Sequence, residues 1–157
     1  FGDFKYTHGT PFRRAIEEGL VDPKKYVILG LRGGLYDPDD LKWAIDQGIT
    51  IISTDKFYEI GMKETIKIIK DVLEDTSTYF TFDIDGIDPS FAPGTGTPEV
   101  GGITVREAQL IIRHLNSLNF IGADVVEVSP PFDINNMTSL VGATIAFEIL
   151  CTMTKTN

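Results

Sequence analysis

Short apolar runs rich in β-branched and aromatic residues alternate with longer amphipathic stretches along this chain. Apolar runs of about four to eight residues are typical of buried strands, whereas apolar positions three or four residues apart are typical of helices. Strands are expected at residues 26–31, 49–54, 78–84 and 123–129. The alternation predicts a single α/β domain over residues 1–157, in which helices cover a mainly parallel sheet in three layers.

Local signals mark where the intervening helices begin and end. Thr10 and Thr104 stand where N-terminal caps are needed, and Gly19 and Gly48 are suited to ending helices. Ile45 is expected to belong to the apolar stripe of the second helix. Helices are expected at residues 11–19, 37–48, 62–73, 105–118 and 140–153.

The composition restricts the possible partners. The chain has 14 Lys and Arg residues against 23 Asp and Glu residues, a net charge of −9, which disfavours nucleic acids and anionic membranes as partners. No run reaches the ~18 to 20 apolar residues of a membrane span, and no signal peptide is recognisable. The single cysteine, Cys151, cannot form an internal disulfide and is expected to be a small buried residue. We therefore expect a cytoplasmic protein.

The segment FDIDGIDPSFAPGTGTPEVGG places carboxylates at the end of the third predicted strand. Ligands of parallel α/β sheets bind beyond the carboxyl ends of the strands. Asp83 and Asp85 are two residues apart, so on an extended chain they would project from the same face. Close carboxylates repel each other unless a cation lies between them, and hard divalent cations accept carboxylate oxygens. This spacing predicts that Asp83 and Asp85 bind metal, and a shared carboxylate suits a pair of ions.

Other interpretations of this motif stay open. Asp-Gly and Asp-Pro favour turns, so Asp83 and Asp85 would also suit a turn, and Asp88, which precedes a proline, fits that role well. A haloacid-dehalogenase-like phosphatase would use Asp83 as its nucleophile, although Ile87 stands where that family has Thr or Val. A calcium loop of the EF-hand type is excluded because Ile87 and Gly94 occupy positions where it needs ligands.

Two further residues are candidates for the chemistry. Glu127 follows two valines at the end of the fourth predicted strand and is expected to be buried. Its carboxylate would match a planar guanidinium, either of a substrate or of a protein arginine such as Arg32. His8 precedes the first helix and would pass protons near neutral pH. Arg13 and Arg14 follow it and are expected to be solvated helix residues, although they would also suit a substrate carboxylate.

The chain resembles the arginase/agmatinase ureohydrolase family in three segments: HGTPFRRAIEEG, FDIDGIDPSFAPGTGTPEVGG and VVEVSPPFD. The first and third are closer to its agmatinase and guanidino-acid hydrolase branch. The resemblance covers essentially the whole chain and implies an arginase-like αβα fold. The family also has Gly-Gly-Asp-His-Ser and Asp-x-His-x-Asp segments upstream, and neither is present here. We therefore expect the C-terminal half of a ureohydrolase domain, N-terminally truncated and inactive alone.

The resemblance implies an enzyme with two Mn²⁺ ions and a hydroxide that bridges them. It would hydrolyse agmatine or a guanidino acid to urea and an amine, as a cytoplasmic homo-oligomer in polyamine metabolism. Asp83 resembles the carboxylate that bridges both ions, and Asp85 resembles the one that binds a single ion. His8 matches the proton shuttle, Glu127 the residue that holds the guanidinium, and Thr97 a hydroxyl of the same pocket. A non-catalytic binding or regulatory relative stays open as an alternative.

Overall fold

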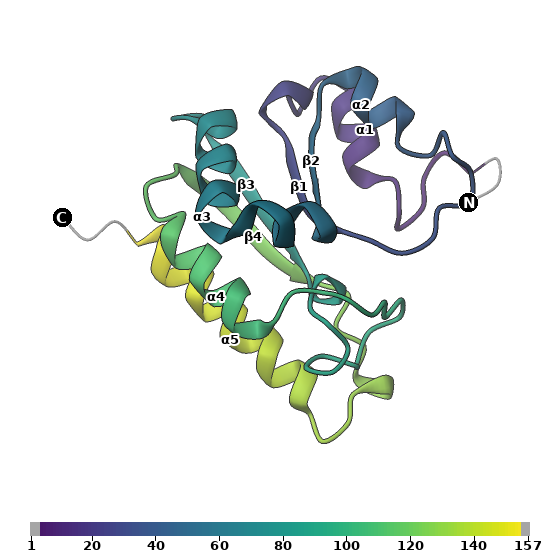
Figure 1. Cartoon of the computed structure of the whole chain (residues 1–157), viewed down its shortest axis with the longest axis vertical. Coiled ribbons are helices and arrows are strands. Elements are labelled where there is room, and N and C mark those ends of the chain that lie inside the picture. Colours follow the sequence, from purple (N-terminus) through teal and green to yellow (C-terminus); the bar gives the residue numbers. More distant parts are fainter. Residues whose placement is uncertain (1–3, 155–157) are drawn as a thin grey trace.

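The computed structural model describes residues 4–154. Strands and helices alternate along this range, as the apolar pattern predicts (Figure 1). The strands are β1 (Val27–Leu31), β2 (Thr50–Ser53), β3 (Thr78–Asp83) and β4 (Phe120–Val126). The helices are α1 (Pro11–Glu17), α2 (Lys42–Gln47), α3 (Thr54–Leu73), α4 (Val105–His114) and α5 (Met137–Met153), with short 3₁₀ helices at Pro23–Lys25, Ile84–Gly86 and Pro130–Phe132.

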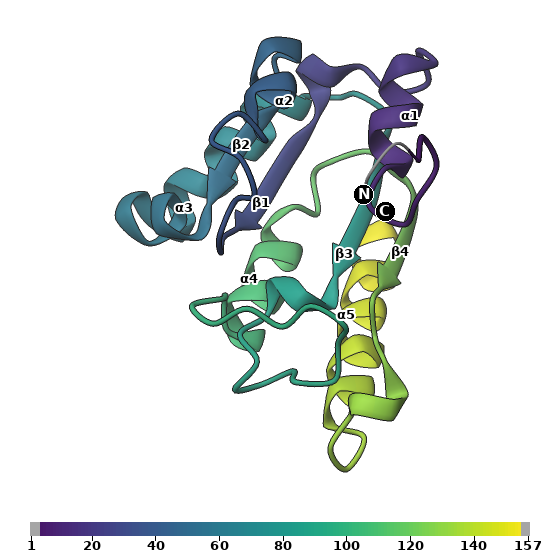
Figure 2. The same cartoon turned by 90° about the vertical axis from the view of Figure 1, so that its right-hand side faces the viewer.

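The four strands form two parallel pairs. β1 pairs with β2, and β3 pairs with β4. In the described part of the chain, no hydrogen-bonded ladder joins one pair to the other. Figure 2 shows β1 and β2 apart from β3 and β4. A cleft of about 670 Å³ is lined by residues of both β1 and β3. The parallel direction is as expected, but these strands do not make one continuous sheet.

Helices pack on both sides of the first strand pair. In Figure 1, β1 and β2 stand between α3 on one side and α1 and α2 on the other, which gives three layers. α5 packs against β4 and α4, and α3 packs against β1 and β2. The buried core draws an isoleucine from each of these long helices, Ile69, Ile112 and Ile145. Removing such side chains from water is the main favourable contribution to folding.

Two predicted helix caps have different outcomes. Thr104 caps α4 in a reciprocal capping box with Glu107, in which each side chain accepts a backbone N–H of the other residue. Thr10 makes no side-chain cap at α1, so that prediction is wrong. Its hydroxyl instead accepts the backbone N–H of Thr7 and donates to the Lys5 carbonyl. Thr10 therefore closes the loop before α1 and leaves the first turn of that helix uncapped.

Several element boundaries also differ from the prediction, and two of the differences have a clear local cause. α3 begins at Thr54, upstream of the expected start at residue 62, because the Ser53 hydroxyl accepts a backbone N–H of the first turn. Gly61, at φ 78°, interrupts this helix, which explains why the helical spacing is regular only after it. The expected fourth strand ran to residue 129. β4 stops before Glu127 because that residue, at φ 64°, leaves the extended region.

Apolar side chains remain on the outer sides of α2 and α5. Ile45 was expected to be in an apolar stripe but is 61% exposed. Cys151 was expected to be buried and is exposed. It shares the open side of α5 with Phe147 and Leu150, because α5 packs only its other side against β4 and α4. Despite this apolar character, no helix in the described range has the length and hydropathy needed to cross a membrane.

Candidate active site

Asp83 and Asp85 lie together at the carboxyl end of β3. Asp83 is the last residue of the strand, and Asp85 lies in the 3₁₀ turn Ile84–Gly86. The shared-face argument is therefore wrong in its geometry, because the turn ends the extended chain before Asp85. The turn nevertheless keeps the two residues close, since the Asp83 Oδ1 accepts the backbone N–H of Asp85 at 3.1 Å. Asp83 thus closes the turn, as the turn interpretation predicts, while its charge stays beside that of Asp85.

The Asp83 carboxyl group resists ionisation. Partial desolvation raises the pKa of Asp83 to about 6, and the charges of Asp85 and Glu127 add to the rise. The charges of Asp85 and Glu127 thus make the surroundings of Asp83 negative, which would favour a cation.

The donor chemistry fits part of a divalent-metal site. Carboxylate oxygens of Asp83 and Asp85 are the hard ligands that Mn²⁺ or Mg²⁺ prefers. Within residues 4–154, however, no three His, Cys, Asp or Glu side chains converge closely enough to hold a metal ion. An octahedral ion needs about six ligands, so these two carboxylates would make up only part of a shell.

The loop formed by residues 88–102 returns to Asp85. Thr97, which is exposed on this loop, donates its hydroxyl to the Asp85 Oδ2 at 2.9 Å. At the base of the loop, the Asp88 carboxylate accepts hydrogen bonds from Ser90 and from the backbone of the glycine pair that ends the loop. Those bonds, the Ser90 hydroxyl first, lower the pKa of Asp88 to about 2. The prediction that Asp88 stabilises a turn is confirmed.

Glu127 lies close to this group but is not buried. It is exposed, contrary to the prediction, because β4 ends before it and its positive φ turns the chain away from the sheet. Its charge contributes to the raised pKa of Asp83, which places it near the carboxylates. None of the ion pairs in the described range includes Glu127. Arg32, its suggested partner, donates instead to the carbonyls of Gly30, Asp85 and Glu99.

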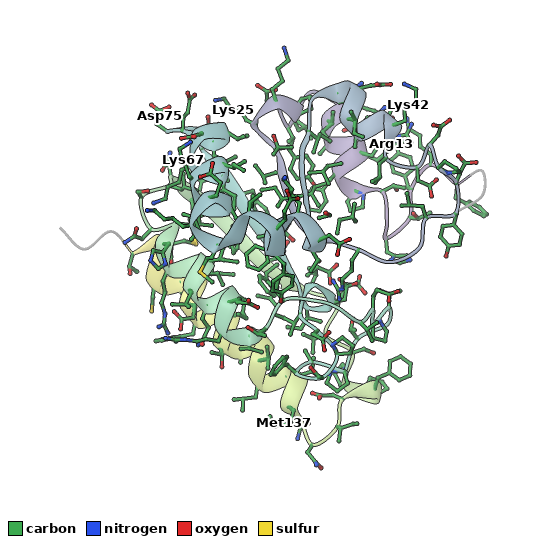
Figure 3. The ribbon with its side chains drawn as sticks, in the orientation of Figure 1. Arg13, Lys25, Lys42, Lys67, Asp75 and Met137 are labelled. Carbon is green, nitrogen blue, oxygen red and sulfur yellow. The ribbon has the colours of Figure 1, made fainter. Side chains whose placement is uncertain are left out.

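His8 and the two arginines that follow it do not line the cleft that the candidate carboxylates line. His8 is exposed in the loop before α1 and does not line the cleft that Asp83, Asp85 and Thr97 line. The two arginines that follow it are occupied by helix contacts. Both pair with Glu17, and the Arg13 guanidinium also lies over the Trp43 ring at 4.7 Å. Figure 3 shows Arg13 among the amino-terminal helices.

Asp124 was missed by the sequence analysis. Its carboxylate accepts hydrogen bonds from the Tyr79 and Thr81 hydroxyls at 2.9 and 2.5 Å. The signal was present in β3, where Tyr79, Thr81 and Asp83 alternate with phenylalanines and therefore share one face. This polar row fixes the strand that carries Asp83.

Comparisons with known proteins agree with the motif pattern. Residues 1–152 match the model of the Arginase family. Guanidinopropionase from Pseudomonas aeruginosa is 55% identical over 151 residues, which are 96% of this chain and 48% of that protein. The mitochondrial agmatinase from Gallus gallus is 42% identical over 149 residues, which are 95% of this chain and 44% of that protein.

A solved structure supports the fold. Proclavaminate amidinohydrolase from Streptomyces clavuligerus has a TM-score of 0.92 and 40% identity, over 98% of this chain and 51% of that chain. The chain thus spans about half the length of the curated relatives it matches. The expected arginase-like α/β fold is confirmed. With the family match extending over residues 1–152, the chain belongs to the arginase family.

Proposed function

We propose that this chain is part of a manganese-dependent hydrolase that converts a guanidino compound to urea and an amine. The observation that carries the proposal is the Asp83 and Asp85 pair at the end of β3, with the Thr97 hydroxyl on Asp85. Since these two carboxylates make up part of a shell, the remaining ligands would come from residues outside this chain. The activity is therefore proposed for the longer protein, with residues 1–157 forming part of its single domain.

Asp83 and Asp85 would hold the metal through their carboxylate oxygens. When bound, Mn²⁺ would supply Lewis acidity that lowers the pKa of water and provides hydroxide near neutral pH. Thr97 orients the Asp85 carboxylate through its hydrogen bond and would line the substrate pocket. Desolvation is the main cause of the raised pKa of Asp83, and a cation at this position would relieve the repulsion by Asp85 and Glu127 that adds to it.

Glu127 would hold the substrate. Its exposed carboxylate would accept two parallel N–H bonds from a guanidinium and so direct the electrophilic carbon towards the metal ligands. When the carbon–nitrogen bond breaks, the departing nitrogen must gain a proton, and His8 would deliver it.

A guanidino acid is the substrate class that we favour. The guanidinopropionase from Pseudomonas aeruginosa shares more identity with this chain than the agmatinase from Gallus gallus does. Agmatine is the second candidate because the net charge of −9 favours a substrate with two positive charges. Arg13 and Arg14 already share Glu17, so we do not assign either of them to a substrate carboxylate.

The test is urea release by the longest natural protein that carries this chain. Loaded with Mn²⁺, it should release urea from guanidinopropionate or guanidinobutyrate faster than from agmatine or arginine. Absence of urea from every compound would favour the non-catalytic alternative, whereas phosphate release with Mg²⁺ would favour the phosphatase. The family match does not favour the latter.

Glu127→Gln tests the assignment of the substrate carboxylate. An amide keeps the shape but loses the charge, so KM should rise at least about tenfold while Mn²⁺ stays bound. Glu59→Gln, at an exposed position of α3, is the matched control and should change neither. An unchanged KM in Glu127→Gln would remove Glu127 from the substrate site.

We also propose a cytoplasmic homo-oligomer with a role in polyamine metabolism, as the family resemblance implies. The exposed apolar side of α5, with Phe147 and Leu150, leaves surface for a further contact. Light scattering of the purified longer protein would give its oligomeric state. A monomer at micromolar concentration would contradict this part of the proposal.

A further inference from the structure

The guanidinium of Arg32 links the two strand pairs. Its Nη1 donates to the Gly30 carbonyl at 3.2 Å, and its Nη2 donates to the Asp85 carbonyl at 2.5 Å. Its Nε and Nη2 both donate to the Glu99 carbonyl, at 3.1 and 2.6 Å. These acceptors belong to β1, to the turn after β3, and to the loop of residues 88–102. Because no ladder joins the pairs in the described chain, Arg32 makes a direct polar connection across the cleft.

Neighbouring contacts support the residues at both ends of the Arg32 connection. The Gly30 carbonyl also accepts the buried Thr54 hydroxyl at 3.0 Å, which ties that end of β1 to the start of α3. On the other side, Glu99 packs against Gly33. A Cβ at Gly33 would lie 2.9 Å from the Glu99 Oε2, so the Glu99 side chain lies directly against the Gly33 backbone. Arg32 therefore connects a strand end that Thr54 also holds to a loop whose Glu99 side chain contacts Gly33.

We propose that Arg32 is a positioning residue, which fixes the backbone of Asp85 and Glu99 and thereby the Asp85 carboxylate and the Thr97 hydroxyl. This inference rests on the proposed function, because it takes Asp85 as a metal ligand. Arginine suits the role because its planar fork directs several N–H donors along fixed lines. A lysine keeps the charge but offers one nitrogen, which cannot reach three separated carbonyls in this arrangement.

Hydrogen–deuterium exchange on the longer protein, prepared free of metal, tests the positioning role directly. Without the Arg32 fork, residues 84–102 should exchange about tenfold faster, because the loop opens more often. Arg32→Lys and Arg32→Ala should both show this increase. Arg113→Ala is the matched control: Arg113 also joins two distant elements, α4 and α5, through Glu148, but lies away from the carboxylates. Its loss should leave exchange of residues 84–102 unchanged.

Two results would overturn the inference. Unchanged exchange in Arg32→Ala would show that the loop is held by other contacts. Full recovery in Arg32→Lys would show that charge acts rather than the fork. If Arg32→Ala does not fold, Arg32→Gln replaces it, because its amide retains donors but cannot span the three carbonyls.

Electron paramagnetic resonance of Mn²⁺ in the longer protein supplies a second measurement. Both Arg32→Lys and Arg32→Ala should weaken Mn²⁺ binding about tenfold, as expected when a residue that orients a ligand is lost. Unchanged affinity in both would overturn the link from Arg32 to Asp85. If the wild-type protein binds Mn²⁺ but releases no urea, the proposed function fails while the exchange result still decides the role of Arg32.

Discussion

The helices that flank the two strand pairs differ in length and in how their first turns are capped. Beside β3 and β4, side chains close the helix starts: the capping box at Thr104 begins α4, and Asp133 accepts the backbone N–H groups of Thr138 and Ser139 at 2.8 Å in the first turn of α5. β1 and β2 have the long helix α3 on one side, which the Ser53 hydroxyl caps, but the helices on their other side, α1 and α2, are short and have no side-chain cap. α1 buries only Ile16, and α2 buries no residue.

The candidate site residues are divided between the same two regions. Asp83, Asp85, Thr97 and Glu127 all come from the region around β3 and β4, whereas His8 precedes the uncapped α1. Metal ligands and substrate groups have to be held to within about 0.5 Å of a working geometry, which rigid elements achieve better than loosely held ones. The region around β1 and β2 contacts this site through Arg32, which donates to the backbone carbonyl of Asp85. Most of the candidate site residues thus belong to the region around β3 and β4, and Arg32 from the region around β1 and β2 stabilises their position.

The largest expected effect is the difference in unfolding free energy between a substitution in the core around α5 and a substitution on α2. Ile145 on α5 is fully buried, so Ile145→Ala should lower the free energy of unfolding by about 2 to 5 kcal/mol. Ile45→Ala on α2 should change it by less than about 0.5 kcal/mol, because that side chain is 61% exposed. Chemical denaturation of the chain measures both. Similar losses in the two variants would show that α2 packs as firmly as α5.

The next effect concerns metal binding by the β3 and β4 region. Asp85→Asn removes one charged ligand and should weaken Mn²⁺ binding by the longer protein by about a hundredfold or more. Asp46→Asn, at an exposed position of α2 that pairs with Lys42, is the matched control and should leave binding unchanged. A titration followed by the Mn²⁺ resonance signal measures both. Equal affinities in Asp85→Asn and the wild type would remove Asp85 from the site.

The sequence predicted features that depend on near neighbours. Thr104 caps α4 as predicted, and the structure adds the reciprocal bond of Glu107, three residues along the chain, which completes a capping box. The carboxylates at the end of β3 follow from one motif. The geometry within that motif was wrong because turn formation by Asp-Gly prevailed over continuation of the strand. Local sequence rules thus located Asp83 and Asp85. The competition between strand continuation and turn formation then decided how the two residues lie relative to each other.

Features that depend on distant segments could not be predicted in the same way. Arg32 and Glu99 are 67 positions apart, and no pattern along the chain shows that they meet. The exposure of Glu127 has a similar cause. Its two preceding valines suggest burial, but a backbone conformation at φ 64° places it outside the strand. Such outcomes depend on how the tertiary structure folds, which single-sequence patterns do not encode.

The third prediction concerns helix capping beside β3 and β4. Thr104→Ala removes the hydroxyl that accepts the Glu107 backbone N–H at 3.1 Å and should cost about 1 kcal/mol of unfolding free energy. Thr104→Ser keeps the hydroxyl and should retain most of that stability. Thermal unfolding followed by circular dichroism compares the two. Equal losses would assign the effect to the threonine methyl group and would weaken the contrast between capped and uncapped helices.

The smallest effect is a pH dependence confined to the same region. Hydrogen bonds lower the pKa of Asp133 to about 2 despite partial desolvation, and the pKa of Asp88 is also about 2, against an ordinary value of 3.8. Because folding lowers both values, the ionised carboxylates stabilise the native state above pH 3.8, and this contribution is lost as the pH falls towards 2.

Asp133→Asn should therefore flatten the loss of stability across that acid range, measured as unfolding free energy against pH. Asp46→Asn on α2 should leave the slope unchanged, because its carboxylate faces water beside Lys42. The difference will be small, since water screens the Asp133 and Asp88 carboxylates. If both variants change the slope equally, the acid sensitivity comes from carboxylates over the whole surface. It would then not come specifically from Asp88 and Asp133 around β3 and β4.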